Sequence, residues 1–506
     1  MARPYDELLA RFAEIRDLQA AQSLAAWDQE VSMPAGGAPA RAWTLAALAG
    51  AVHQRSTDAR LATLAERLWR GRARLGRVPR RQVELARRAV RKARRIPLDL
   101  ARELALAESR GLETWREARR RRDWAAFAPA LEHMLALKRR AARLAVRAEG
   151  PTPGSRAPLY DALLDDFEPG MTSARLDDLL GELRDFTVPL LKQVVAARVS
   201  VDLAPLVGRF DVEAQRAFAR EVVVGMGIDL QRGRMDLSTH PFCSGLAPDD
   251  VRMTGRFDAR DLRGGLFGVV HEAGHGLYEQ GLDPARARQP AGGAVSMAIH
   301  ESQSRLWENL VARSRPFWVH WLPRLRRQHP RLRRVSVDGI WRAANAVQPS
   351  FIRVEADELT YNLHILLRYE IERDLIEGRQ SVRDLPQRWN DGMRRLLGLT
   401  PRHDAEGVLQ DIHWAMGSFG YFPTYSLGNL YAAQFMQAAR RDLRGLDARI
   451  AQGRLAPLRE WLRERIHRHD QLESAEQLVR RVTGRPLSVD AFADHLRARV
   501  AAVYGL

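Results

Sequence analysis

Residues 268–280, GVVHEAGHGLYEQ, carry the side chains with the clearest capacity for chemistry. His271 and His275 are four positions apart, so both imidazoles project from one face of a helix and can share a metal ion about 2 Å from each nitrogen. Glu272 lies about 100° further round that helix, where it can hold a metal-bound water without ligating the ion. With 14 histidines, a chain of this length contains HExxH by chance only about 0.02 times. The spacing predicts a catalytic metal site. The alternative is a coincidental pair of helix histidines.

A catalytic zinc site also needs a third protein ligand and an open fourth position. The segment 296–310, SMAIHESQSRLWENL, has a helical pattern and offers Glu301 on the helix that follows the HExxH helix. His300 and Glu308 are rivals on spacing alone, and any of the three can be an ordinary surface side chain. The spacing favours Glu301 without deciding the choice.

The composition predicts a folded, soluble chain in a reducing compartment. Its 506 residues are 45% hydrophobic and 28% charged, which supports a sizeable core and rules out collagen-like and low-complexity classes. Cys243 is the single cysteine, so an intramolecular disulfide and a cluster of paired thiolates are both excluded. No apolar window is long enough for a membrane span, and the N-terminal residues lack the apolar region of a signal peptide. We therefore expect a cytoplasmic protein that makes no membrane contact.

The formal net charge of +18 suggests an alternative class of function, that of a noncatalytic basic helical protein that binds nucleic acid. Only three of the 80 basic residues are lysine, namely Lys92, Lys138 and Lys192, and the arginines spread over nearly the whole chain. A GC-rich coding sequence produces such a bias whatever the function. Because no zinc-finger, homeodomain or RNA-binding motif accompanies the charge, nucleic-acid binding is the weaker alternative.

Helical periodicity dominates the chain. The opening segment repeats apolar residues every three or four positions from Tyr5 to Leu18, which is typical of an amphipathic helix. Alternating residues predict a strand at 250–257 with a partner at 235–242. The predicted fold class is mainly α with a small β-sheet just before the HExxH helix. Further helices are expected at 43–68, 83–93, 98–122, 124–149, 173–199 and 212–226.

Attack on an amide carbonyl creates an oxyanion, which needs hydrogen-bond donors beside the metal. His413 precedes the loop 419–425, FGYFPTY, which carries Tyr421 and Tyr425, and any of these three side chains can supply the donor. The alternative for the tyrosines is a packing role. His240 follows the same logic, although a histidine before proline at a strand end can simply bond to backbone.

A polar stripe is predicted on the helical segment 351–367, FIRVEADELTYNLHILL. Arg353, Asp357, Tyr361 and His364 fall on one face, while the leucines between them can face a core. On the residues alone, such a stripe is most often solvated or salt-bridged, with the first two as an ordinary i,i+4 pair.

The motifs taken together resemble the carboxypeptidase Taq family, also called thermostable carboxypeptidase 1, whose members are HExxH metallocarboxypeptidases. The likeness extends from WDQEVSMP near Trp27 to the closing VYGL, so it covers essentially the whole chain. Six motifs stand in the order of the family: HPF at 240–242, DVRMT at 250–254, HEAGH at 271–275, HESQ at 300–303, IRVEAD at 352–357 and GVLQDIHW at 407–414.

The resemblance implies roles for the site residues. His271, His275 and Glu301 become the metal ligands and Glu272 the catalytic base that takes a proton from the metal-bound water. Zn²⁺ is the first choice of ion, and the same ligands also suit Co²⁺ or Mn²⁺. The other expected roles are Arg353 as the anchor of the substrate carboxylate, Arg252 as its runner-up, His240, His413, Tyr421 and Tyr425 as further substrate-binding residues, Asp357 as a residue that orients the anchor or a metal histidine, and Gln410 and Asp411 as supports behind the contact residues.

The resemblance also implies a fold and an activity. We expect an elongated helical body of the neurolysin-like zincin type, split by a deep active-site groove with the small sheet beside it. A single peptidase domain spans 1–506, with 1–150 as a helical layer over the groove and 159–506 as the catalytic body. The expected activity is broad-specificity removal of C-terminal residues from peptides with a free C-terminus, by a homodimer. An HExxH oligopeptidase that cuts internal bonds is the alternative, since it shares every ligand but needs no carboxylate anchor.

Overall fold

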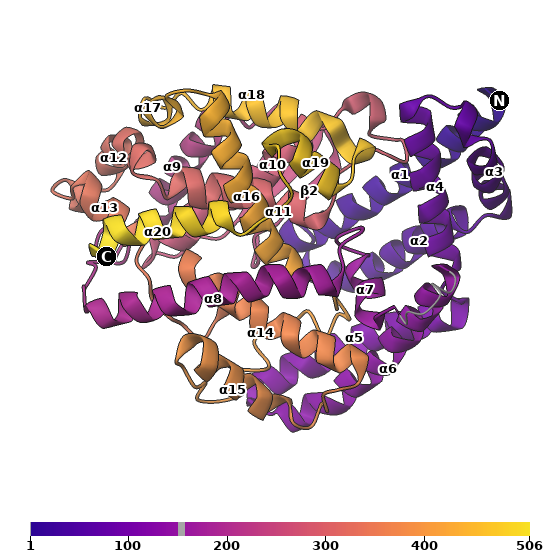
Figure 1. Ribbon diagram of the computed structural model, residues 1–506, viewed down its shortest axis with the longest axis horizontal. Helices are drawn as coiled ribbons and strands as arrows, with labels where there is room; N and C mark the ends of the chain where they lie inside the picture. Colours follow the sequence, from indigo (N-terminus) through magenta and orange to yellow (C-terminus); the bar gives the residue numbers. More distant parts are fainter. Residues whose placement is uncertain (1, 150–156) are drawn as a thin grey trace.

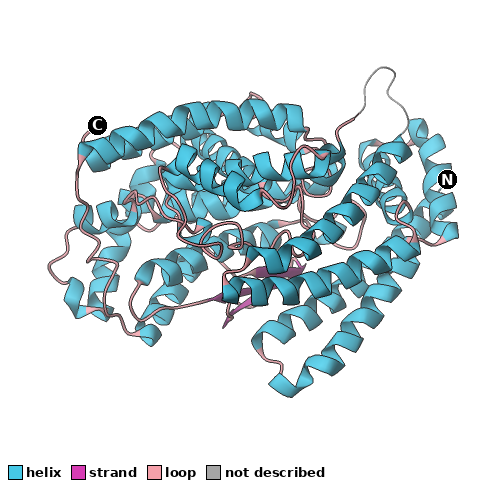
Figure 2. Ribbon diagram, turned by 90° about the horizontal axis from the view of Figure 1, so that it is seen from below, coloured by secondary structure: helices cyan, strands magenta, loops and turns pink. Residues whose placement is uncertain are grey.

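Helices carry most of the chain, as the periodicity predicts, and surround one small sheet (Figures 1 and 2). The computed structural model describes residues 2–149 and 157–506. In chain order the α-helices are α1 Ala2–Val31, α2 Ala38–Ser56, α3 Ala59–Arg70, α4 Arg77–Arg94, α5 Leu98–Arg121, α6 Trp124–Glu149, α7 Leu159–Leu164, α8 Ser173–Ala197, α9 Val212–Met226, α10 Leu262–Gly281, α11 Met297–Arg305, α12 Arg315–Gln328, α13 Val337–Ala344, α14 Glu358–Glu377, α15 Leu385–Leu397, α16 Pro423–Asp442, α17 Leu446–Ala451, α18 Ala456–Arg465, α19 Ala475–Thr483 and α20 Asp490–Tyr504.

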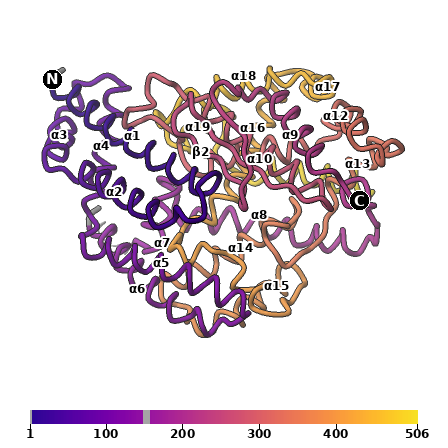
Figure 3. The backbone as a smooth tube through the Cα atoms, turned by 180° about the vertical axis from the view of Figure 1, so that it is seen from behind, coloured from indigo at the N-terminus to yellow at the C-terminus, as the bar shows by residue number. Residues whose placement is uncertain are grey.

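The remaining elements are short. The strands are β1 Gly233–Leu237, β2 Cys243–Ala247 and β3 Asp250–Gly255, and the short helical turns are η1 Ala35–Gly37, η2 Arg72–Arg74, η3 Pro284–Arg286, η4 Leu306–Ala312, η5 Pro330–Leu332, η6 Arg353–Glu355 and η7 His467–Leu472. The predicted fold class, mainly α with a small sheet, is therefore confirmed. The two described ends of the chain lie at opposite ends of the long axis (Figures 1 and 3).

The sheet lies directly before α10 in the chain and packs against it. Its order is β1-β3-β2, with β1 parallel and β2 antiparallel to β3. Val251 and Met253 of β3 are buried, as the alternation at 250–257 predicts. A Cβ added at Gly276 of α10 would lie 2.7 Å from the sulfur of Met253, so a larger residue at this position would require the Met253 side chain to move.

Short polar side chains begin the helices that matter for the site. The Asp261 carboxylate accepts from the backbone N–H of Arg263 at the start of α10, and the Ser296 hydroxyl accepts from Ile299 N–H at the start of α11. The prediction of a single helix at 43–68 is wrong. Helix α2 ends at Ser56, and Asp58 is the N-cap of a separate helix, α3, so two helices occupy this range.

Among the described residues, two hydrophobic cores hold the helices together. A small one joins α1, α3 and α4 through residues such as Leu8, Leu64 and Val83, and a much larger one extends from α5 to α20. The division into a layer 1–150 over a groove and a body 159–506 stays a prediction, and most of the linker at 150–158 lies outside the described residues. Within the described ranges, no helix is both long and apolar enough to cross a bilayer.

Candidate active site

The helices α10 and α11 cross closely enough to bring Glu301 to the two histidines. A Cβ added at Gly274 of α10 would lie 2.6 Å from the Cα of Ser304 and 2.7 Å from the carbonyl oxygen of Gln303, both in α11. On the other side, a Cβ at Gly428 of α16 would lie 2.5 Å from Cγ of Glu301. Glycines at these crossings therefore permit three helices to meet around one carboxylate.

His271, His275 and Glu301 form a group whose ligand atoms all lie within 4.8 Å of one another. The Nε2 atoms of the two histidines are 3.5 Å and 3.4 Å from Oε2 of Glu301. Two ligands bound at about 2.1 Å with a tetrahedral angle are about 3.4 Å apart. The donor set and its spacing therefore fit a divalent metal ion.

His271 is oriented by Glu308, which lies in η4, a turn of π-helix that continues α11. Nδ1 of His271 is 2.9 Å from Oε2 of Glu308. Because the carboxylate can only accept, Nδ1 carries the proton and Nε2 keeps its lone pair for a metal. Arg313 donates to the other oxygen of Glu308 at 3.0 Å. Burial raises the pKa of Glu308, but His271 and Arg305 lower it more, and the carboxylate stays ionised.

His275 is oriented by a second chain of contacts that ends in Glu279. Its Nδ1 is 2.6 Å from Nδ1 of His300, and Nε2 of His300 is 2.7 Å from Oε1 of Glu279. One set of neutral tautomers satisfies every contact: His275 donates to His300, and His300 donates to Glu279. Burial, and then His300, lower the pKa of His275 to about 3, which keeps it neutral and able to ligate.

Glu301 is held from behind by Arg305, four residues later in α11. The Arg305 guanidinium donates to Oε1 of Glu301 at 2.6 Å, so that Oε2 remains toward the histidines. Burial raises the pKa of Glu301, whereas Arg305 and His271 lower it well below its usual value. The same guanidinium lies over the Tyr361 ring, 4.3 Å from its centre.

Glu272 is buried next to the triad and is only 8% exposed. Burial raises its pKa to about 7, with His271 opposing and Glu301 reinforcing the shift. Its side chain makes no hydrogen bond with any residue that the structure describes. A carboxylate with a proton affinity near neutrality can both accept and return a proton.

Arg353 lies in η6 and contacts residues distant in sequence. Its Nε and Nη2 donate to Oδ1 of Asp411 at 3.0 Å and 2.9 Å, and its Nη1 donates to the Tyr361 hydroxyl at 3.0 Å. Gln410 accepts from the backbone N–H of Arg353 at 2.9 Å. Gln410 and Asp411 thus both hold Arg353 in place.

A second guanidinium shares the same carboxylate. Arg368 donates to Oδ2 of Asp411 at 2.6 Å and is fully buried, and Arg353 is 6% exposed. His364, beside them, stays neutral because burial and Arg368 hold its pKa well below the usual value. Two buried cations against one carboxylate leave a positive charge that favours an incoming anion.

The predicted stripe on 351–367 is wrong, because α14 begins only at Glu358. Asp357 is its N-cap, and its carboxylate accepts from the backbone N–H groups of Leu359, Thr360 and Gln348. The expected i,i+4 pair of Arg353 and Asp357 therefore does not form, since capping oxygens are already engaged by backbone donors.

His413, Tyr421 and Tyr425 gather beside Arg353. Nε2 of His413 is 3.3 Å from the Tyr425 hydroxyl, and the Tyr421 and Tyr425 rings are 5.3 Å apart. The Arg353 guanidinium lies 4.9 Å from the centre of the Tyr425 ring. Burial raises the pKa of Tyr421 to about 12, and the charge of the Glu301 carboxylate adds to this shift. The Tyr421 hydroxyl therefore keeps its proton and can donate.

The structure does not bring Arg252 and His240 into this cluster. The Arg252 guanidinium is bound by both oxygens of Asp250 at 3.0 Å and lies over the Trp27 ring of α1. His240 is exposed, and its ring makes no hydrogen bond within the described residues.

The contacts also reveal residues to which the sequence assigned no role. Arg305 and Glu279 each lie four positions after a proposed ligand, Glu301 and His275, so helical spacing alone could have indicated them. Arg313 and Arg368 carried no such signal, because their partners lie on other elements or across a π-helical turn. Glu308 and His300, weighed above as rival ligands, contact the proposed ligands His271 and His275 instead.

The chain is similar over its whole length to known carboxypeptidases. Residues 7–500 match the family described as carboxypeptidase Taq (M32) metallopeptidase. The chain is 44% identical over 505 residues to thermostable carboxypeptidase 1 of Thermus thermophilus, with 99% of each chain covered. It is 36% identical over 503 residues to carboxypeptidase 1 of Bacillus subtilis, covering 99% of this chain and 98% of the other.

The fold also matches solved structures over nearly the whole chain. The crystal structure of an M32 carboxypeptidase from Deinococcus radiodurans matches with a TM-score of 0.95 at 38% identity and covers 100% of both chains. Metallocarboxypeptidase 1 of Trypanosoma cruzi matches with a TM-score of 0.94 at 34% identity over 99% of both chains. The chain therefore belongs to the carboxypeptidase Taq family of M32 metallopeptidases and is a metallocarboxypeptidase.

Proposed function

We propose that this metallocarboxypeptidase removes C-terminal residues of broad chemical type, with Glu272 as its catalytic base and Arg353 as the reader of the free carboxylate. One observation carries the proposal. The triad of His271, His275 and Glu301 lies beside a buried base and is linked through Arg305 and Tyr361 to a buried guanidinium. Broad specificity is carried over from the family resemblance.

The triad is the proposed metal site. A divalent ion held there supplies Lewis acidity, which polarises a carbonyl and acidifies a water molecule. Zn²⁺ remains our first choice because two imidazoles and one carboxylate at tetrahedral spacing suit it, and Co²⁺ or Mn²⁺ suit the same donors.

Glu272 accounts for the proton transfers. Its carboxylate accepts the proton of the attacking water and passes it to the amine nitrogen as the peptide bond breaks. The pKa of about 7 that burial produces makes both transfers feasible near neutral pH. Removing this base by an isosteric amide is expected to slow turnover by at least about 100-fold.

Arg353 accounts for the preference for a free terminus. Its guanidinium is preoriented by Asp411 and Tyr361, and the excess positive charge shared with Arg368 compensates a bound carboxylate. Tyr421, Tyr425 or His413 then supplies the hydrogen bond that stabilises the oxyanion, since all three lie beside Arg353. His240 and Arg252 remain proposed substrate contacts on the sequence argument alone.

Comparison of peptide ends tests the exopeptidase proposal against the oligopeptidase alternative. N-acylated peptides that end in a free carboxylate or in an amide are incubated with the metal-loaded enzyme. We expect stepwise release of amino acids from the free acid only, and equal hydrolysis of both would favour internal cleavage. Glu272→Gln is the matched control, because it should retain one metal per chain by elemental analysis and lose turnover.

The family membership decides against the noncatalytic nucleic-acid-binding alternative. Two further expectations concern the oligomeric state and the cellular location of the protein. The homodimer follows from the resemblance, and sedimentation equilibrium of the full chain tests it. The cytoplasmic location follows from the single cysteine, and cell fractionation tests it.

A further inference from the structure

Glu372 of α14 is a fully buried carboxylate outside the metal triad. Its Oε1 accepts from the indole N–H of Trp414 at 3.0 Å, and its Oε2 accepts from the Tyr160 hydroxyl at 2.9 Å and from the backbone N–H of Gly420 at 3.1 Å. Burial raises the pKa of Glu372 to about 7, and these three donors oppose the shift. A carboxylate buried in this way is costly, so its hydrogen bonds must replace the water that it has lost.

Two of the three donors lie in the loop 413–421, each next to a proposed substrate-binding residue. Trp414 follows His413, and Gly420 precedes Tyr421. His413 and Tyr421 are half-buried, and their rings lie 5.5 Å apart, whereas Trp414 and Gly420 are buried. One carboxylate therefore holds both ends of the loop, directly beside the two side chains that stay accessible.

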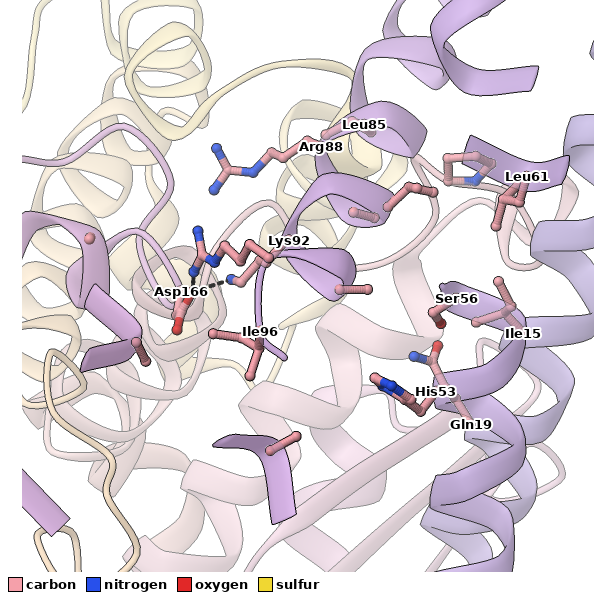
Figure 4. A pocket seen from close by; sticks show the side chains of 18 of the residues that line it. Ile15, Gln19, His53, Ser56, Leu61, Leu85, Arg88, Lys92, Ile96 and Asp166 are labelled. Atoms are coloured by element: carbon pink, nitrogen blue, oxygen red, sulfur yellow. Dashed lines mark hydrogen bonds and ion pairs between the residues drawn. The ribbon is translucent and has the colours of Figure 1, made fainter. Parts of the chain in front are cut away.

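Helix α7 packs against the same loop. A Cβ added at Gly420, whose φ is +91°, would lie 2.8 Å from the backbone carbonyl carbon of Leu163 in α7, so this close approach requires a glycine. Leu163 also lines a cavity of about 590 Å³, which Figure 4 shows with Lys92 on one side and His53 on the other. Because α7 borders a cavity, it packs less completely than a core helix, and the hydrogen bonds to the carboxylate contribute more to holding the loop.

The same helix α14 holds the proposed carboxylate anchor. The Tyr361 hydroxyl accepts from Arg353 at 3.0 Å, and Arg368 donates to Asp411 at 2.6 Å. Tyr361, Arg368 and Glu372 are seven and four positions apart, so they share one face of α14. One helix therefore contacts both the group that would bind the substrate carboxylate and the loop that would bind the oxyanion.

We propose that Glu372 is a positioning residue, which fixes the loop 413–421 so that the oxyanion donor keeps its place relative to Arg353. The inference rests on the proposed function, because it takes the oxyanion donor from this loop. Glu372 touches no reacting atom and acts through the loop. Since the oxyanion exists only after the carbonyl is attacked, a displaced donor weakens the transition state more than it weakens substrate binding.

Glu372→Gln tests this role with a side chain of the same shape. The amide oxygen can still accept from Gly420 and Tyr160, but the amide NH2 group then meets the indole N–H of Trp414, donor against donor. For an N-acylated free-acid peptide, we expect kcat per metal-loaded chain to fall about tenfold and KM to change by less than about twofold. Affinity for a phosphonate peptide, which mimics the tetrahedral intermediate, should fall by the same factor as kcat. Wild-type values of kcat and of phosphonate affinity would overturn the proposal.

Removal of one donor at a time separates positioning from stability. Trp414→Phe deletes a donor in the loop, and Tyr160→Phe, the matched control, deletes a donor to the same carboxylate from α7. Both variants should unfold at a lower temperature, because each leaves Glu372 one hydrogen bond short. Only Trp414→Phe should lower kcat, by about three- to tenfold, and Tyr160→Phe should keep at least about half of it. Equal losses of kcat in the two variants would make Glu372 a structural residue and overturn its positioning role.

A double variant checks that Glu372 acts through the loop. In the Trp414→Phe background, the amide introduced by Glu372→Gln faces no N–H group, so it should lower kcat further by less than about twofold. Losses that multiply in full would overturn the proposal. Glu372→Asp is the second variant if Glu372→Gln yields no folded protein. It keeps the charge but withdraws the carboxylate from the loop, and it should likewise lower kcat and not KM.

Wild-type kinetics separate this inference from the proposed function. Equal hydrolysis of free-acid and amidated peptides would overturn the proposed reading of the carboxylate by Arg353, and the effect of Glu372→Gln on kcat could still be measured with either peptide. Release of amino acids from the free acid only, with kcat unchanged in Glu372→Gln, would overturn the positioning role alone.

Discussion

Glu308 Oε2 lies 2.9 Å from Nδ1 of His271, on the side of the imidazole away from the Nε2 atom that faces Glu301. The π-helical turn η4 carries this carboxylate, and Arg313 and Arg305 hold it in place. One helical segment therefore supplies a proposed metal ligand, Glu301, and the group that sets the tautomer of another ligand. Such contacts behind a metal ligand fix its direction and raise its basicity.

Glu308→Gln is expected to weaken metal binding by at least about tenfold. The amide cannot supply the negative charge that stabilises the Nδ1–H of His271 and that pairs with Arg313. Competition with a chelator of known affinity measures the effect, and the absorption spectrum of the Co²⁺ form reports any change in the ligand field. Glu476→Gln, at an exposed site on α19, is the control. Equal metal affinity in both variants would contradict the assigned role.

Arg353→Lys should lower kcat/KM for free-acid peptides by about 100-fold, toward the negligible rate expected for amidated peptides. The substitution preserves the charge but removes the planar fork that Asp411 and Tyr361 orient. Steady-state kinetics on paired acid and amide substrates measure the change. Arg252→Lys makes the same substitution at a guanidinium already bound by Asp250. A larger loss in Arg252→Lys would make that residue the anchor.

Gly274→Ala should destabilise the protein by about 1–3 kcal/mol and weaken metal binding. The added methyl group would lie 2.6 Å from backbone Cα of Ser304, so α10 and α11 must separate and draw Glu301 away from the histidines. Thermal unfolding and metal titration measure the two effects. Gly268→Ala, on the same helix, is the matched control because nothing lies within 4 Å of its added Cβ. Its stability should be unchanged or slightly higher, since alanine favours a helix over glycine.

Glu168 is expected to make folding stability depend on pH. It is buried, and accepts from the Ser296 hydroxyl and from Ala298 N–H at the start of α11. Burial raises its pKa from 4.5 to about 7, so between these values the folded protein holds a proton that the unfolded chain has lost. This contribution to stability is therefore fully present below pH 4.5 and is lost as the pH rises through 7.

Glu168→Gln cannot titrate at this position, so the stability of wild type relative to this variant should fall by about 3 kcal/mol between pH 4.5 and pH 8.5. Denaturant unfolding of both proteins, stripped of metal, measures the difference at each pH. Titration of the metal-site residues is common to both and cancels. A difference that does not vary with pH would show that Glu168 stays ionised in the folded state throughout.

The elements closest to the site follow from local patterns. The HExxH helix is expected from apolar residues at helical spacing, and it forms as α10 with Asp261 as its cap. The strand at 250–257 is expected from alternation, and β3 forms there with Val251 and Met253 buried. Both patterns depend on neighbours within a few positions, which is why they can be recognised without a fold.

The segment after Arg353 shows where such patterns fail. Its polar residues suit one face of a helix, yet Asp357 caps α14 and leaves Arg353 outside it. Periodicity does not distinguish a capping aspartate from one inside a helix when both positions are polar. The partner of Arg353 is Asp411, which another loop brings to it.

The sequence by itself determined the family, the helical class and the candidates for ligand and base, because spacing along a helix sets which side chains share a face. Only the tertiary structure decided what surrounds them: Glu308 behind His271, His300 and Glu279 behind His275, and Asp411 between two guanidiniums. These contacts join separate elements, and their distances depend on how closely α10, α11 and α16 pack at Gly274 and Gly428. Packing of that kind is a property of the whole folded chain, since each close approach is fixed by every other element that the core must accommodate.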